Sequence, residues 1–168
     1  MLAFHAKSNL PDRPYQYAPV EKLMSDLAQV EEQIVRFAGE ETLCRGYTTL
    51  HWAETNRDCA LELRQMGVRG LTGRFGVGDS GKPFTTRYYF DDATNTRLHG
   101  RNMWYDPSTD LYFVNCPRFL NNVPVALVAF YYDRLLDGTA SRRPFDAIDF
   151  LVHEEHFWRG FMGGRGFK

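Results

Sequence analysis

Alternating strand-like and helix-like segments in the first 71 residues constrain the fold of this chain most strongly. A short apolar segment at 1–5 is typical of a strand. Over 20–37, apolar residues recur at alternating steps of three and four, which predicts an amphipathic helix. A strand at 48–52, a helix at about 56–67 and a strand at 68–71 follow. Such alternation predicts an α/β fold with parallel strands and outer helices.

The rest of the chain has weaker signals of the same two kinds. Aromatic and apolar runs predict strands at 84–90, 111–114 and 145–152. A short capped helix is predicted at 91–99, and an amphipathic helix at 125–138. We therefore expect one α/β domain over residues 1–159, followed by a flexible glycine-rich tail over residues 160–168.

The charge and composition of the chain exclude several classes of partner. Lys and Arg number 20 against 21 Asp and Glu, which gives no general attraction to nucleic acid or to an anionic membrane. No apolar run reaches the roughly 20 residues that span a bilayer, and the first residues do not resemble a secretory signal. The 3 cysteines have no CxxC spacing, so neither a disulfide framework nor a thiolate zinc site is indicated. We expect a cytoplasmic protein.

Three histidines share one position in the predicted topology. His5, His51 and His153 each stand at the C-terminal end of a predicted strand, where α/β sheets place their sites. Histidine is a common metal ligand and transfers protons near neutral pH, although any one of them could be a hydrogen-bonded structural residue. The repetition favours a shared site.

Two other motifs are less informative. The histidines of His153-Glu154-Glu155-His156 are three residues apart, whereas the HExxH metalloprotease helix needs four, so that motif is rejected. Glu154 either orients His153 or is an exposed loop carboxylate. The glycines at 76–81 lack the spacing of a phosphate-binding loop and predict a turn.

Five short segments carry a resemblance to a known family: FHAKSNLP at 4–11, FAGEE at 37–41, LHW at 50–52, GVRGL at 67–71 and FLVHE at 150–154. Together they resemble a divergent bacterial branch of the polysaccharide deacetylase superfamily. The resemblance implies a partial or distorted (β/α) barrel. It also implies a metal-dependent hydrolase that removes acetyl groups from an N-acetylated carbohydrate.

The same resemblance implies roles for individual residues. Usual members bind a divalent metal, zinc or similar, with one Asp and two His, and use a second Asp as base and a late His as acid. His5 looks like the first histidine of the metal motif, with Asn9 in place of the second. His51 lies where the family has a groove segment, which implies either a substitute ligand or a substrate contact. His153 matches the late acid, with Glu154 beside it. Candidate substrate contacts are Asn9, Trp52, Arg57 and Trp104.

One expected part of the family pattern has no counterpart in this sequence. The Asp-Asp motif of usual members precedes the segment that resembles His5 to Pro11. We therefore expect a shortened chain. Its activity would be lost if the missing strand is essential, and its open sheet edge would favour a homo-oligomer. The alternative is a non-catalytic carbohydrate-binding or remnant domain, in which Trp52, Trp104, Tyr105 and Trp158 stack on sugars.

Overall fold

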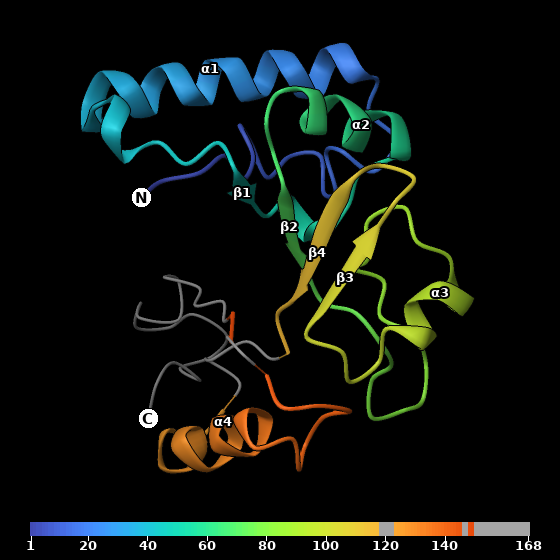
Figure 1. Cartoon of the computed structure of the whole chain (residues 1–168). Coiled ribbons are helices and arrows are strands. Elements are labelled where there is room, and N and C mark those ends of the chain that lie inside the picture. The colour runs from blue at the N-terminus through green and yellow to red at the C-terminus, as the bar shows by residue number, and fades with distance from the viewer. Residues whose placement is uncertain (118–122, 146–147, 150–168) are drawn as a thin grey trace. The chain divides into compact units, whose positions relative to one another are not determined.

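The computed structural model describes residues 1–117, 123–145 and 148–149. Its sheet has four strands in the order β1-β2-β4-β3 (Figure 1). Their bounds are Tyr47–Thr48 for β1, Gly70–Gly73 for β2, Met103–Asp106 for β3 and Leu111–Asn115 for β4. Strands β1 and β2 are parallel, while β3 and β4 are antiparallel. The predicted α/β class is confirmed as a mostly parallel open sheet with helices, and β1 and β3 form its edges in the described part.

The α-helices are α1 (Val20–Ala38), α2 (Arg57–Gln65), α3 (Asp92–Arg97) and α4 (Val128–Leu136). Single 3-10 turns occur at Glu40–Thr42, His51–Ala53 and Val125–Leu127. The predicted caps are confirmed, since the Asn56 side chain accepts from Cys59 N and the Asp91 side chain accepts from Thr94 N. Within the described ranges, no helix is both long and apolar enough to cross a membrane.

The chain divides into two compact units. The first comprises Met1–His99 and Met103–Val114 and contains helices α1, α2 and α3 together with the sheet up to Val114. The second comprises Gly100–Asn102 and Asn115–Lys168, and its described part contains α4. In this second unit, Arg142 N donates to Gly100 O, and Phe145 N donates to Leu135 O. The expectation of a single domain over 1–159 stays a prediction.

Aromatic side chains fill the core of the first unit. The buried ring of Phe113 on β4 contacts four other rings, at centroid distances between 4.6 and 6.0 Å, from Phe75, Tyr88, Tyr89 and Phe90. Leu71 of β2 and Leu111 of β4 are fully buried on the same core. Helices α1 and α2 contribute apolar faces to it through Leu23, Leu27, Cys59, Ala60 and Leu63. One face of the sheet thus packs against the core.

Some strand predictions are wrong, for identifiable reasons. The strand predicted at 48–52 ends at Thr48, and His51 lies in a 3-10 turn. The segment 84–90 forms turns instead of a strand. The three consecutive rings at 88–90 all contact Phe113. In a strand, successive side chains would point to opposite faces and could not do so. Strand β3 was not predicted. The segment 1–5 contributes only the isolated parallel bridge of Leu2 with Leu43, and most of the strand predicted at 145–152 lies outside the described residues.

Candidate functional site

The N-terminal segment runs alongside residues 42–51 and is held there by backbone contacts. Leu2 N donates to Thr42 O at 2.6 Å, and Cys44 N donates to Leu2 O at 2.7 Å. Further along, His51 N donates to His5 O at 3.2 Å. These bonds place two sequence-predicted residues, 46 positions apart, next to each other.

The side chains of His5 and His51, here called the histidine pair, are in direct contact. His5 Nε2 lies 3.2 Å from His51 Nδ1, and the ring centroids are 5.3 Å apart in an edge-to-face arrangement. His5 Nδ1 lies 2.7 Å from Thr49 O, and because a carbonyl can only accept, Nδ1 carries the proton. In the neutral ring, His5 Nε2 therefore presents a lone pair toward His51.

Trp52 continues the site from His51. The two rings are 6.0 Å apart by centroid, and the Trp52 side chain is 43% exposed. Trp52 Nε1 donates to Asp12 Oδ1 at 2.6 Å, and the Arg13 guanidinium lies 5.3 Å from the centre of the Trp52 ring. Loop 11–14 thus fixes the orientation of an aromatic ring that remains open to solvent.

The backbone around Trp52 is strained. Trp52 has φ +60° and Ala53 has φ +48°, and Arg13 in the facing loop has φ +56°. Left-handed conformations are disfavoured for residues with a Cβ and concentrate at functional sites, where the surrounding structure holds them. Two further residues with a Cβ, Tyr88 and Asp110, also have positive φ, so this strain is not confined to the Trp52 region.

A buried carboxylate follows the Trp52 turn. The Glu54 side chain is 4% exposed and forms an ion pair with Arg13 Nη1. Burial raises the pKa of Glu54 above its ordinary value, and the neighbouring Arg13 charge opposes that rise without cancelling it. Among the described residues, the side-chain contact of Glu54 is with Arg13 and not with either histidine, so the carboxylate supports the loop that holds Trp52.

The histidine pair offers two nitrogen donors to a metal ion. Among the described residues, no third His, Cys, Asp or Glu joins them in a group that could hold a metal. His153 and Glu154, the predicted catalytic residues, lie outside the described residues. The arrangement can therefore contribute two ligands, or pass a proton between two imidazoles.

The predicted substrate contacts are dispersed. Trp52 lies beside the histidine pair, and Asn9 is exposed in the loop before Asp12. Arg57 Nη2 donates to Ser108 O at 2.9 Å in the turn between β3 and β4. Trp104 on β3 packs against the core, so its ring is only partly accessible. Of these four residues, the structure joins only Trp52 to the histidines.

Sequence reasoning missed Asp12, Arg13 and Glu54. Asp12 and Arg13 lie between Pro11 and Pro14, a pattern that indicates only an irregular loop. Glu54 follows His51 by three positions, which by itself predicts neither burial nor an ion pair. No local pattern connects these side chains, because the contact between Arg13 and Glu54 joins residues 41 positions apart.

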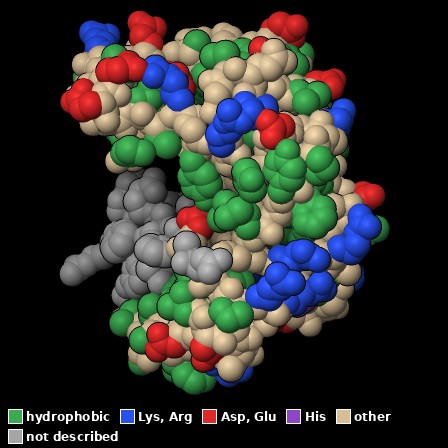
Figure 2. Space-filling view, in the orientation of Figure 1, with side chains coloured by type: hydrophobic (Ala, Val, Ile, Leu, Met, Phe, Trp, Pro, Cys, Tyr) green, Lys and Arg blue, Asp and Glu red, His purple; other side chains and the backbone are tan. Residues whose placement is uncertain are grey.

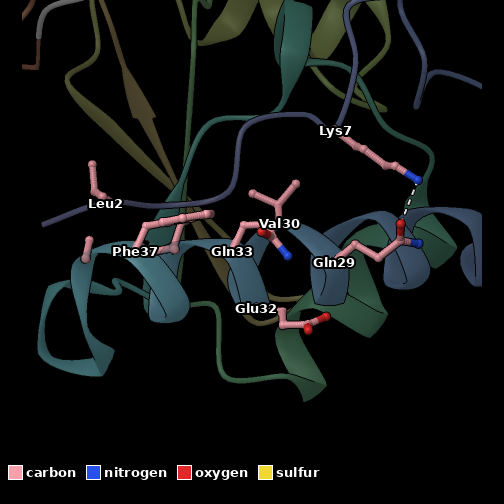
Figure 3. Close-up of a pocket in the computed structure, with 9 residues that line it drawn as sticks. Leu2, Lys7, Gln29, Val30, Glu32, Gln33 and Phe37 are labelled. Atoms are coloured by element: carbon pink, nitrogen blue, oxygen red, sulfur yellow. Dashed lines mark hydrogen bonds between the residues drawn. The ribbon is translucent and has the colours of Figure 1, made fainter.

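A separate groove lies between the N-terminal segment and α1 (Figure 3). It has a volume of about 560 Å³, and Lys7 Nζ donates to Gln29 Oε1 at 2.7 Å across its border. Neither histidine of the pair lines it. Its walls are largely apolar, and the lining residues are Leu2, Lys7, Gln29, Val30, Glu32, Gln33, Ile34, Phe37 and Ala38.

Comparison with known proteins identifies no relative of this chain: no protein-family model, no curated protein and no solved structure matches it.

Proposed function

We propose that the chain binds a divalent metal through His5 and His51 and acts as a metal-dependent hydrolase of the polysaccharide deacetylase type. Its substrate would be an N-acetylated carbohydrate, and its complete fold a partial or distorted (β/α) barrel. The observation that carries the proposal is the 3.2 Å approach of two ring nitrogens, one of which has its tautomer set by Thr49 O.

The donor geometry fits a metal ion. Zinc–nitrogen bonds of 2.0–2.1 Å at tetrahedral angles separate two ligand nitrogens by about 3.3 Å, close to the 3.2 Å between His5 Nε2 and His51 Nδ1. Metal-binding histidines usually donate their second ring N–H to a carbonyl or carboxylate, as His5 does to Thr49 O. Both features are compatible with ligation, and the same 3.2 Å separation also suits a direct hydrogen bond between the two rings.

The remaining residues of the proposal have distinct roles. When bound, a divalent metal polarises an acyl carbonyl and lowers the pKa of a bound water. Glu54, buried and ion-paired with Arg13, would support the loop that orients Trp52. His153, as the late acid of the resemblance, would protonate the leaving amine, with Glu154 orienting it. Trp52, with Asn9 and Arg57 farther out, would contact the sugar.

A second function is favoured by the absence of a third metal-binding side chain among the residues that the structure describes. In this alternative the domain binds carbohydrate without catalysis. The half-exposed Trp52 ring, fixed by Asp12 and Arg13, would then be the main sugar contact. The two functions share a ligand class and differ in their need for the histidine pair.

Zinc binding measured by calorimetry tests the metal site. We expect weak binding by the wild type, reduced at least tenfold in both His5→Ala and His51→Ala, because two imidazoles are the main donors. His99→Ala is the matched control, since His99 is exposed and its Nδ1 accepts only from Val77 N among the described contacts. Equal zinc affinity in all four proteins would reject the site.

Acetate release from N-acetylated chitotetraose then separates the two functions. Metal-dependent release that is lost in His51→Ala supports the hydrolase. Zinc binding without release in any condition supports the non-catalytic alternative.

Homo-oligomerisation through an open sheet edge also remains a proposal. Strands β1 and β3 are the edges of the described sheet, and unpaired edge strands favour association with another chain. Light scattering that gives a monomer mass at all accessible concentrations would reject it.

A further inference from the structure

The face of the sheet that points away from the core carries paired tyrosines. Tyr105 of β3 and Tyr112 of β4 are partners in the antiparallel register, and their ring centroids are 5.0 Å apart. Both side chains are exposed, at 43% and 46%, whereas the next pair, Trp104 with Phe113, faces the core. Figure 2 shows hydrophobic side chains gathered over the strands of the sheet.

A third tyrosine extends this row to the opposite edge. Tyr47 of β1 is the register partner of Gly70 on β2, and it is 37% exposed. A Cβ at Gly70 would lie 2.6 Å from Tyr47 Cδ2, so the ring occupies the space that the glycine leaves open. On the other side of β2, Tyr112 N donates to Arg69 O at 2.9 Å. Tyr47, Tyr112 and Tyr105 thus span the sheet, and we call them the tyrosine row.

Two rings of the tyrosine row are held in place through their hydroxyl groups. Tyr105 Oη donates to Asp110 Oδ1 at 2.8 Å, and the Tyr47 hydroxyl bonds to Thr72 Oγ1. Because these rings stand on strands and their hydroxyls are tethered, they lose little conformational freedom when a ligand covers them. The two tethered rings are therefore preformed, and the planes of the Tyr105 and Tyr112 rings are tilted by 42° to each other.

One small cluster of charges lies beside the row. Asp110 Oδ2 lies 2.5 Å from Arg64 Nη2 and 3.4 Å from Arg69 Nη1, so the carboxylate balances one of the two guanidinium groups and the cluster keeps one positive charge. A nucleic acid ligand needs several unpaired cations along its phosphates. The other end of the surface is formed by Met103 and Val114, which are uncharged register partners. An uncharged ligand with flat apolar faces fits this surface best.

We propose that the tyrosine row is a carbohydrate-binding platform on which the sugar rings of a neutral polysaccharide stack. Aromatic rings offer a flat apolar surface with polar hydroxyl edges, which matches a sugar ring with apolar faces and peripheral hydroxyls. The platform would hold the polysaccharide chain apart from the histidine pair. The choice of carbohydrate rests on the proposed function, whereas the surface itself does not.

Binding of N-acetylated chitotetraose and of cellotetraose, measured by calorimetry in the presence of EDTA, tests the platform. We expect the wild type to bind at least one of them, since the metal is removed and the row does not depend on it. Tyr105→Ala and Tyr112→Ala should each weaken that binding about tenfold. Tyr17→Ala is the control, because Tyr17 is 87% exposed and lies outside the sheet. Circular dichroism melting verifies that every variant is folded.

Three results would overturn the platform. The first is that neither oligosaccharide binds, and the second is that both row variants bind with unchanged affinity. The third is a wild-type dimer that Tyr112→Ala converts to monomer, because this would assign the face to a second copy of the chain. Oligosaccharide binding without zinc binding would leave the platform standing and reject the metal site. Zinc binding without oligosaccharide binding would leave the metal site standing and reject the platform.

Discussion

Arg13 forms an ion pair with Glu54, a residue 41 positions later whose side chain is almost completely buried. The same guanidinium lies over the Trp52 ring, so one side chain supports both the carboxylate and the aromatic surface. Removing the ion-pair partner of a buried charge is strongly destabilising, which makes this pair a sensitive point of the site.

Arg13→Ala should destabilise the protein by about 2–3 kcal/mol at neutral pH, because Glu54 would remain buried and charged without a partner. This loss of folding free energy should be smaller at about pH 4, because Glu54 is more readily protonated there in both the folded and the unfolded state. Urea unfolding at both pH values measures it. In the Arg13→Ala background, Glu54→Gln should recover part of the stability, and no recovery would contradict the explanation.

Asp106 makes stability depend on acid pH. Burial would raise its pKa, but hydrogen bonds from Tyr89, Ser108 and Thr109 outweigh burial and hold the pKa below its ordinary value. A depressed pKa in the folded state means that the stabilisation is complete above the unfolded pKa of about 3.9 and is lost as the pH falls through the folded value. Asp106→Asn should flatten the stability profile below about pH 4, as measured by urea unfolding.

Tyr15 makes stability depend on alkaline pH. Burial raises its pKa to about 12, and the nearby charge of Asp26 adds to this effect. Because the folded pKa is raised, the contribution is complete below the unfolded value of about 10 and is lost as the pH rises from there toward 12. Ultraviolet absorbance of tyrosinate follows the titration. Tyr15→Phe should cost about 1 kcal/mol at pH 7 and remove this alkaline loss.

Asn95 is a structural anchor for the glycine-rich turn. Its fully buried side chain accepts from Gly76 N and donates to Gly76 O and Phe84 O. Asn95→Ala should therefore cost about 2–4 kcal/mol in thermal or urea unfolding, since three hydrogen bonds to the turn are lost and Gly76 N is left without an acceptor, while Gly76 O still accepts from Phe84 N. Thr96→Ala, one position along the same helix and exposed, should cost less than about 1 kcal/mol.

The helices and their caps were predictable because their signals are local. The apolar period that predicts a helix over 20–37 reappears as α1, and Gly39 ends it with a φ of +90°, a value that glycine adopts easily. Asn56 and Asp91 accept from backbone groups three residues away, which a sequence pattern can reveal.

The candidate site was only half predictable. The proximity of His5 and His51 followed from their common place after adjacent extended segments, even though His51 lies in a turn and not at the end of a strand. The ion pair between Arg13 and Glu54 depends on how a proline-containing loop folds back over Trp52, and no residue period encodes that. The aromatic segment at 84–90 was misread because three rings converge on one partner in three dimensions.

The contact between His5 and His51 closes a loop of 46 residues. In the unfolded chain, keeping two such distant points together would cost roughly 4 kcal/mol of chain entropy. An introduced covalent bridge across this contact would therefore act mainly on the denatured ensemble, by removing its most extended members, whereas a shared ion would stabilise the folded state by binding to it alone. The free energy of unfolding would then report on ligand occupancy of the two imidazoles, even when no reaction is observed.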